Sequence, residues 1–466
     1  MSYTEFLKRK QIKQYDAGFH VSKSDLNKTL FEYQKDIVKW SLQRGKAAIF
    51  ANTGLGKTVM QVEWAQKVYE HTGLPILLIV PLAVAAQTIR EAHEHLNVTV
   101  HRIRQDADVQ DGLNITNYEN LHNIEPTQFG GVVLDESSIL KSFTGKIRNQ
   151  IIDDFKNTPY KLACTATPAP NDFMELGNHS EFLNIMSRTE MLAMYFIHDS
   201  GETQKWRLKG HGADKFWEWV STWAVMIKSP ADLGYDASAF ELPPLIMKEE
   251  VIQADAQEGF LIPQVAETLG ERQAARRESV QERCERAAAL ANQSEDQFLI
   301  WCNLNAESEL LKRLIPGSVE VKGSDTPEHK EQAMIDFADG TIKVLITKPK
   351  IAGMGMNWQG CNEMAFVGLS DSFEQIYQAI RRCYRFGQKR PVTVHMVTSE
   401  LEGNVVANIK RKEKDFLIMQ EEMAKLTKNI LNPDIANARN EKMLYEGTET
   451  IKLPSFLKTK ETVNNG

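Results

Sequence analysis

The chain has 466 residues, of which 42% are hydrophobic and 25% are charged, and it carries a formal net charge of −7. These values are typical of a globular protein with two or three domains. No apolar run is long enough to span a membrane and the first residues lack the pattern of a signal peptide, so we expect a cytoplasmic protein without a membrane partner. The negative charge excludes a protein that binds nucleic acid over its whole surface, but it leaves a local basic groove open.

Five cysteines are scattered along the chain and include no C-x-x-C pair. Their number and spacing predict neither a disulfide framework nor a zinc site. We expect small buried thiols.

The chain begins with residues 1–25, which mix charged and aromatic residues and predict an arm docked on the first domain. A helix is expected over residues 30–40, and it carries Gln34. A glutamine amide both donates to and accepts from an adenine edge, and an aromatic neighbour can cover the ring. Taken alone, Gln34 would be interpreted as a solvent-exposed helix residue. Its position in the helix just before a phosphate loop favours the adenine contact.

That phosphate-binding loop is predicted for residues 51–58, which read Ala-Asn-Thr-Gly-Leu-Gly-Lys-Thr. A short apolar run over residues 46–50 ends just before the loop, and apolar residues recur at helical spacing after it until Gly73. Ala51 stands where the usual G-x-x-x-x-G-K-[ST] pattern has its first glycine. A glycine-containing turn before a helix is therefore the alternative.

The residue types in this loop suit a nucleoside triphosphate. Gly54 and Gly56 let main-chain N–H groups turn toward a β-phosphate, and the following helix points its positive end at the same place. Lys57 supplies a charge for the β- and γ-phosphates, and the hydroxyl of Thr58 suits Mg²⁺. The loop residues expected to contact the nucleotide are Thr53, Gly54, Leu55, Gly56, Lys57 and Thr58.

Short apolar runs then alternate with helical patterns. The runs lie at residues 76–80, 98–100, 113–115, 131–134 and 161–164. This alternation predicts a parallel sheet covered by helices on both faces, and such sheets bind ligands at the carboxyl ends of their strands.

Polar residues follow two of these strands directly. The run at 131–134 ends at Asp135 and Glu136, where Asp135 would hold the water shell of the metal and Glu136 would orient and deprotonate the attacking water. Two adjacent acids after a strand are also common in surface turns, but the phosphate loop upstream favours a hydrolase. The run at 161–164 ends at the sequence Thr-Ala-Thr-Pro over residues 165–168, which links the metal end to the second domain or is only a proline-ended loop.

Residues 176–292 separate this region from a second one. They are rich in Trp, Phe and Met up to residue 245 and charged and alanine-rich from residue 254, so we expect a helical insertion and a linker. Glutamates balance the arginines of the charged part, which favours a solvated face over a nucleic-acid contact.

The second alternating region predicts another parallel sheet, without a phosphate loop. Its strands are expected at residues 297–301, 319–321, 343–347, 365–367 and 392–397. Residues 378–385 predict a helix on which Arg382 and Arg385 share one face, and arginines supplied from a neighbouring lobe stabilise the transition state of phosphoryl transfer. A solvated basic helix is the alternative. A last helix over residues 403–431 carries an apolar stripe that packs back on the lobes or binds a partner.

Taken together, these stretches resemble the superfamily 2 helicases, and among them the Swi/Snf-like translocase branch related to the DEAD/DEAH-box proteins, from about Leu30 to about Val397. The first motif of this family commonly begins with alanine, as it does at Ala51. Further stretches resemble family motifs: Gln34, Pro81-Leu82, 115–119, Asp135-Glu136, 165–168, 353–357, Gln378-Ala379 and the Arg382-to-Gln388 stretch with its trailing Gly387-Gln388.

The chain departs from the family at Ser137-Ser138, where Ala-His or Gly-His is usual, and this leaves the coupling contact open. The short insertion and the lack of a visible chromatin-reading module favour a bacterial or bacteriophage protein.

The resemblance implies a P-loop NTPase of two RecA-like parallel-sheet α/β lobes, with ATP and Mg²⁺ between them. The expected parts are an arm (1–25), lobe 1 (26–175), the helical insertion and linker (176–292), lobe 2 (293–400) and a helix with a tail (401–466). It implies catalytic roles for Lys57, Glu136, Arg382 and Arg385 and metal contacts from Thr58 and Asp135. Nucleotide contacts would come from Gln34, the phosphate loop, Gly355 and the two arginines.

The implied function is a nucleic-acid-stimulated ATPase that moves along DNA, with double-stranded DNA preferred and RNA left open. The nucleic acid would lie on the face carrying Thr116 and Thr347, held by its phosphates. Three alternatives remain: a strand-separating helicase, for which we see no wedge; the motor subunit of a restriction, methylation or repair complex with a methylase or nuclease partner; and a non-catalytic binding module.

Overall fold

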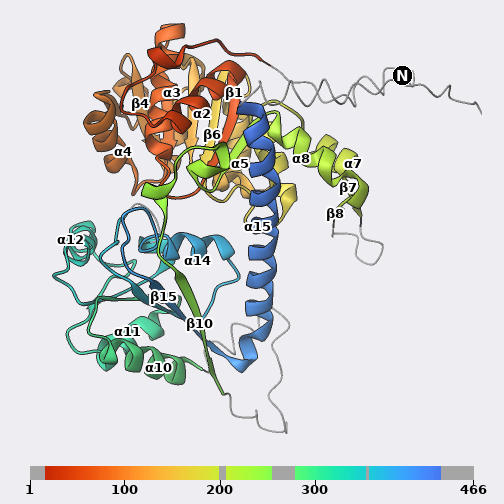
Figure 1. The fold of residues 1–466 in the computed structure, drawn as a ribbon. Coiled ribbons are helices and arrows are strands. Elements are labelled where there is room, and N and C mark those ends of the chain that lie inside the picture. Colours follow the sequence, from red (N-terminus) through yellow and green to blue (C-terminus); the bar gives the residue numbers. More distant parts are fainter. Residues whose placement is uncertain (1–15, 199–205, 254–278, 353–355, 432–466) are drawn as a thin grey trace, which may run out of the picture.

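The structure is a computed structural model that describes residues 16–198, 206–253, 279–352 and 356–431. Two α/β lobes face each other, and the long helix α15 (Gly403–Leu431) runs beside both of them (Figure 1). Each lobe is built on one parallel sheet. The two parallel-sheet domains predicted from the sequence are confirmed.

The described part of lobe 1 has a seven-stranded sheet in the order β3-β4-β2-β5-β6-β1-β9, and all neighbouring strands are parallel. Its strands are β1 (Lys46–Ala51), β2 (Ile76–Val80), β3 (Val100–Arg102), β4 (Leu113–Asn117), β5 (Gly131–Asp135), β6 (Tyr160–Thr165) and β9 (Ala224–Ile227). Strand β2 is buried along its whole length because side chains cover both faces of the sheet.

Two apolar clusters cover the two faces of this sheet. One contains Ile76 and Leu78 and is packed by α2 (Glu32–Arg44) and α3 (Lys57–Thr72). The other contains Leu77 and Ile79, and on it pack α5 (Lys146–Asp154), α6 (Leu176–Phe182), α7 (Arg188–Tyr195) and α8 (Ala213–Ser221). Alternate residues of one strand thus serve opposite clusters, as the pleat requires.

Lobe 2 has six described strands in the order β10-β15-β14-β11-β13-β12, again all parallel. They are β10 (Leu245–Ile252), β11 (Phe298–Cys302), β12 (Val319–Glu320), β13 (Val344–Thr347), β14 (Glu363–Val367) and β15 (Val392–Ser399). Its helices are α10 (Val280–Gln293), α11 (Asn305–Leu314), α12 (Pro327–Ala338), α13 (Pro349–Ala352) and α14 (Phe373–Ile380).

Several short elements connect these strands and helices in the described residues. Helix α4 (Ala85–Glu91) continues into a π-helical turn, η2 (Ala92–Leu96), and an antiparallel hairpin joins β7 (Phe196–His198) to β8 (Trp206–Leu208). The 3₁₀ turns are η1 (Lys23–Asp25), η3 (Asp106–Asp108), η4 (Tyr118–Asn123), η5 (Pro126–Gln128), η6 (Ser137–Lys141), η7 (Phe173–Glu175), η8 (Gly210–Gly212), η9 (Pro230–Leu233), η10 (Ser238–Phe240) and η11 (Glu400–Glu402).

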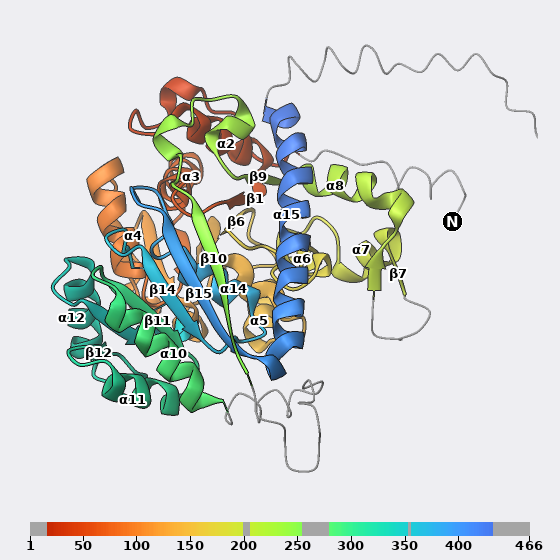
Figure 2. The same ribbon diagram turned by 60° about the horizontal axis from the view of Figure 1, so that its bottom comes forward.

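Helix α15 packs back on the molecule, which confirms the first of the two roles predicted for it. Phe416, Met419 and Met423 of its apolar stripe are buried. Near its end, the hydroxyl of Thr427 accepts a hydrogen bond of 3.0 Å from the backbone N–H of Met226 in β9. The helix leaves lobe 2 after β15 and ends on lobe 1, and Figure 2 shows it beside both. Helix α15 therefore links the two lobes along one side of the molecule.

The segment 176–292, predicted as a helical insertion and linker, also supplies a strand to each sheet. Strand β9 pairs with β1 in lobe 1, and β10 pairs with β15 in lobe 2. Neither strand has a clear sequence signal: β9 has only four residues, and β10 lies largely exposed at the sheet edge and mixes charged with apolar residues. In the described residues the segment contains the helices α6, α7 and α8 and, at its end, α10, which packs on the sheet of lobe 2.

All five cysteines are buried and free, as expected from the sequence. Among the residues that the structure describes, we find no helix whose length and apolar character would suit a membrane span.

Candidate active site

A cavity of about 420 Å³ lies between the two lobes. It brings together nearly every site residue predicted from the sequence. The predicted residues that line it are Gln34, Thr53, Gly54, Leu55, Gly56, Lys57, Thr58, Asp135, Glu136, Arg382 and Arg385. Gly355 lies outside the described residues.

The phosphate loop connects β1 to α3 through two glycines in the left-handed region, Gly54 at φ +89° and Gly56 at φ +72°. The positive φ of Gly56 favours glycine, and a Cβ there would stand 2.4 Å from the Gln34 side-chain nitrogen, which would have to shift. Ala51 has no positive φ and ends strand β1, so the first position of the pattern does not need a glycine. The Nζ of Lys57 donates 2.9 Å to the carbonyl of Ala51, which keeps the lysine folded over the loop.

The acidic pair lies at the carboxyl end of β5. The Nε2 of Gln61 donates 2.7 Å to the Oδ1 of Asp135, and the hydroxyl of Tyr118 donates 2.6 Å to its backbone carbonyl. Burial raises the pKa of Asp135. Glu136 has φ +50°, a strained conformation for a residue with a side chain. Burial, and next the negative charge of Asp135, raise its pKa to about 7, a value that suits a general base at neutral pH.

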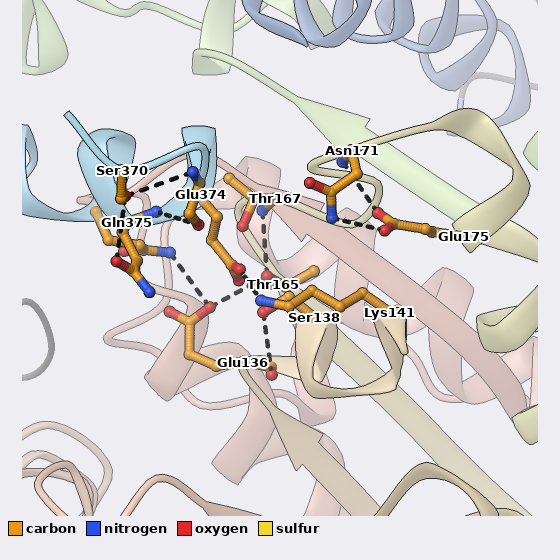
Figure 3. Close-up of polar contacts among 12 residues, drawn as sticks. Glu136, Ser138, Lys141, Thr165, Thr167, Asn171, Glu175, Ser370, Glu374 and Gln375 are labelled. Carbon is orange, nitrogen blue, oxygen red and sulfur yellow. Dashed lines mark hydrogen bonds and ion pairs between the residues drawn. The ribbon is translucent and has the colours of Figure 1, made fainter. Parts of the chain in front are cut away.

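Both lobes contact Glu136, as Figure 3 shows. The hydroxyl of Thr165, at the end of β6, donates 3.1 Å to its Oε2, and the Nε2 of Gln378 in lobe 2 lies 3.5 Å from the same oxygen. Beside this contact, Lys141 of lobe 1 forms an ion pair with Glu374 of lobe 2. The carboxylate therefore lies at the lobe interface.

The two arginines lie in the cavity, but not on a helix. Helix α14 ends at Ile380, so the prediction that Arg382 and Arg385 share one helix face is wrong. The reason is local: the Nε of Arg382 donates 3.1 Å to the carbonyl of Gln378 and satisfies the end of α14. Burial lowers the pKa of Arg382 to about 10, which leaves it charged at neutral pH. Arg385 donates to the side chain of Asn357.

The trailing Gly387-Gln388 has a structural role. The Nε2 of Gln388 donates 2.9 Å to the carbonyl of Gln359, 3.0 Å to that of Cys361 and 3.2 Å to that of Cys383. These bonds hold the loop that carries the two arginines.

Gln34 lines the cavity, yet its amide is already engaged by the protein. Its Oε1 accepts 2.9 Å from the backbone N–H of Phe31, and its Nε2 donates 3.1 Å to the carbonyl of Leu55. It supports the phosphate loop in this arrangement, and its role as an adenine contact stays a prediction.

The hydroxyls of Thr116 and Thr347 are engaged within the protein, and the nucleic-acid face that these residues are expected to mark stays a prediction. Both are buried, and they donate 3.1 Å to the carbonyls of Ile103 and Val321, respectively. Thr116 is the last residue but one of β4 and Thr347 is the last residue of β13, and each holds the chain that follows the neighbouring strand.

The departure at Ser137-Ser138 has its own partners. The Oγ of Ser137 lies 3.1 Å from the Nε2 of the buried His179, whose pKa burial lowers to about 4, so the imidazole is neutral. Ser138 donates 3.4 Å to the carbonyl of Glu136. The acidic motif is thus joined to α6.

The cavity fits a magnesium nucleotide. The hydroxyl of Thr53 and the Nε of Arg385 are buried and have no hydrogen-bond partner among the described residues, so both remain available as donors to phosphate oxygens. Thr58 and Asp135 supply the oxygens that Mg²⁺ prefers.

Sequence reasoning assigned no contact to part of the lining. Phe240 and Gln359 face the cavity, and so do Asn357 and Phe386, which lie in stretches that resemble family motifs. Phe240 lies some 200 positions from the phosphate loop, and no local pattern points to it.

Two family models match the chain. Residues 33–195 match the SNF2-related domain, and residues 281–387 match the helicase conserved C-terminal domain. These matches support a Snf2-like superfamily 2 helicase core. Each match covers most of one lobe, and together they include the four predicted catalytic residues Lys57, Glu136, Arg382 and Arg385.

The relatives are far longer proteins. The TATA-binding protein-associated factor mot1 of Schizosaccharomyces pombe is 32% identical over 117 residues, which are 23% of this chain and 6% of the relative. The bifunctional helicase and thymine dioxygenase JBP2 of Leishmania braziliensis is 31% identical over 87 residues, 18% of this chain and 8% of the relative. The chain thus matches less than a tenth of these relatives.

Among solved structures, the Sulfolobus solfataricus SWI2/SNF2 ATPase core in complex with dsDNA has 16% identity to the chain. The comparison covers 89% of this chain and 99% of that chain, with a TM-score of 0.41.

Proposed function

We propose that the chain is an ATP hydrolase that uses double-stranded DNA as its track and moves along it without sequence preference. The observation that carries the proposal is the inter-lobe cavity, in which a phosphate loop and an acidic pair from lobe 1 meet two arginines from lobe 2.

The residues divide the work of hydrolysis. Lys57 and the loop N–H groups bind the β- and γ-phosphates, and Glu136 orients the attacking water and takes its proton. Arg382 and Arg385 stabilise the charge that develops on the transferred phosphoryl group. Thr58 and Asp135 would hold Mg²⁺, which neutralises phosphate charge when bound.

Movement follows from the division of this site between lobes. Neither lobe alone holds the whole set, so bound ATP favours the closed arrangement and hydrolysis removes that preference. The contact of Gln378 with Glu136 and the Lys141–Glu374 ion pair both cross the interface between the lobes, so closure would change them.

DNA is proposed as the polymer because residues 33–195 match the SNF2-related domain. A methylase or nuclease partner stays an alternative. The predicted bacterial or bacteriophage origin also stays a prediction, because the relatives named above come from Schizosaccharomyces pombe and Leishmania.

Displacement of a third strand from a DNA triplex tests translocation. We expect ATP-dependent displacement by the wild-type chain and none by Lys57→Ala. The control Lys67→Ala, which removes a lysine of the same helix that pairs with Glu70 at the surface, should behave as wild type. Unwinding of a forked duplex by the chain alone would instead support a strand-separating helicase.

A further inference from the structure

Four aromatic residues form a connected cluster at the cavity. Phe31 and Tyr33 come from the start of α2. Phe386 comes from the loop of lobe 2 that carries Arg382 and Arg385, and Phe240 comes from the connector between β9 and β10, residues 228–244. The ring of Phe240 lies 5.4 Å from that of Phe31, 5.8 Å from that of Tyr33 and 5.2 Å from that of Phe386. Phe240 is thus the ring that joins the two lobes.

The connector is anchored to lobe 1. The hydroxyl of Tyr235 donates to Asp36 of α2, and Lys23 forms an ion pair with the same carboxylate. Within turn η10, the backbone N–H of Phe240 donates 2.8 Å to the carbonyl of Ala237. Phe240 is therefore held beside the helix that carries Gln34.

The cluster reaches the phosphate loop at two points. The hydroxyl of Tyr33 donates 3.0 Å to the carbonyl of Leu55. A Cβ on Gly54 would stand 3.0 Å from the Cβ of Phe386, so the backbone of lobe 2 approaches the loop closely there. Any group bound next to the phosphates on this side meets aromatic rings.

Two rings of the cluster stay exposed at the cavity, which suits an aromatic ligand. Phe31 is 54% exposed and Phe386 is 44% exposed, although both line a cavity. The rings of Phe31 and Phe240 stand at 76° to each other, which offers one face and one edge to a flat ring. A nucleobase attached to phosphates in the loop fits this corner.

We propose that Phe240 forms the aromatic wall of the base-binding subsite and transmits base occupancy to Phe386 in lobe 2. The inference rests on the proposed function and deepens it. Phe240 lies outside both segments that match family models, 33–195 and 281–387, so neither match assigns it. Arg385 precedes Phe386 directly, and base binding thereby supports the loop that carries a proposed catalytic arginine.

Equilibrium binding of two probes separates the base from the phosphates. Mg-ATP carries both, whereas Mg-tripolyphosphate carries phosphates alone. For Phe240→Ala we expect a Kd for ATP about 5- to 150-fold above wild type and an unchanged Kd for tripolyphosphate, because one stacked base is lost. Phe240→Trp should bind ATP within about threefold of wild type, since a larger ring keeps the stack.

Two controls complete the set. Phe143→Ala removes an aromatic ring that is 47% exposed and packs on Arg148 and Arg188 outside the cavity, and it should change neither Kd. Lys57→Ala should weaken both probes. An unchanged ATP affinity in Phe240→Ala, or an equal loss for both probes, would overturn the inference and leave the proposed function standing. Absence of ATP binding by the wild-type chain would overturn both.

Discussion

At the scale of single residues, Glu136 combines a strained backbone, partial burial and contacts from both lobes. Its environment sets its protonation at neutral pH, because burial and the charge of Asp135 raise its pKa to about 7. This group must be ionised to accept a proton from water.

The pH dependence of hydrolysis follows. We expect kcat/KM for ATP to rise as pH increases through about 7, since this quantity reports the free enzyme. The raised pKa also means that the stability which protonation of Glu136 contributes is fully present below about 4.5 and lost as pH rises through about 7. A pH–rate profile measured beside a pH series of urea unfolding checks both; a flat rate from pH 6 to pH 8 would contradict the first.

Thr165 positions the carboxylate of Glu136 through its hydroxyl. Replacing it by valine should lower kcat about tenfold with little change in KM, because one hydrogen bond to the base is lost. Thr165→Ser keeps the hydroxyl and should recover most of the rate. Steady-state kinetics decide, and equal defects in valine and serine variants would rule out the positioning role.

At the scale of elements, the sequence predicted well wherever a strand is a continuous apolar run. Strand β5 and the acids at its end, and β1 with its loop, were found from local pattern alone, because a parallel sheet buries both faces and aligns its carboxyl ends. Strand β9 has four residues and pairs only with a distant segment, so no local period marks it. The end of α14 before Arg382 depends on hydrogen bonds that periodicity does not contain.

The two glycines that cap helix α3 give a matched test of the phosphate loop. Gly56 and Gly73 flank α3, both with positive φ, but a Cβ on Gly73 meets nothing within 4 Å. Gly56→Ala should weaken ATP binding, since its Cβ would displace the Gln34 amide that donates to the carbonyl of Leu55 in the loop. Gly73→Ala should cost about 1 kcal/mol of stability and leave the affinity unchanged. Calorimetric titration and thermal unfolding measure the two effects, and equal affinities in both variants would be inconsistent with this loop geometry.

At the scale of the whole molecule, α15 connects the lobes beside the cavity. The ring of Phe416 lies 5.5 Å from that of Phe373 in α14, while Thr427 bonds to β9 of lobe 1. The Nε2 of Gln420 also donates 2.8 Å to the side chain of Asn52 in the phosphate loop. One helix thus contacts both lobes and the loop.

Helix α15 should therefore contribute strongly to stability. Met423 is 1% exposed and Leu417 is 55% exposed on the same helix. Met423→Ala should lower the free energy of unfolding by about 2–5 kcal/mol, whereas Leu417→Ala should change it by less than about 0.5 kcal/mol. Urea unfolding of the two variants provides the comparison, and similar losses would mean that the helix does not dock as described.

The central claim is that the inter-lobe cavity hydrolyses ATP and that DNA controls it. The most direct measurement is steady-state ATP hydrolysis by the purified chain, alone and with single-stranded DNA, double-stranded DNA or RNA, beside Glu136→Gln and the control Glu70→Gln at an exposed residue. We predict that double-stranded DNA stimulates hydrolysis, and that the stimulated rate is at least about 100-fold lower in Glu136→Gln and unchanged in Glu70→Gln. Hydrolysis that no polymer stimulates, or that persists in Glu136→Gln, would contradict this account.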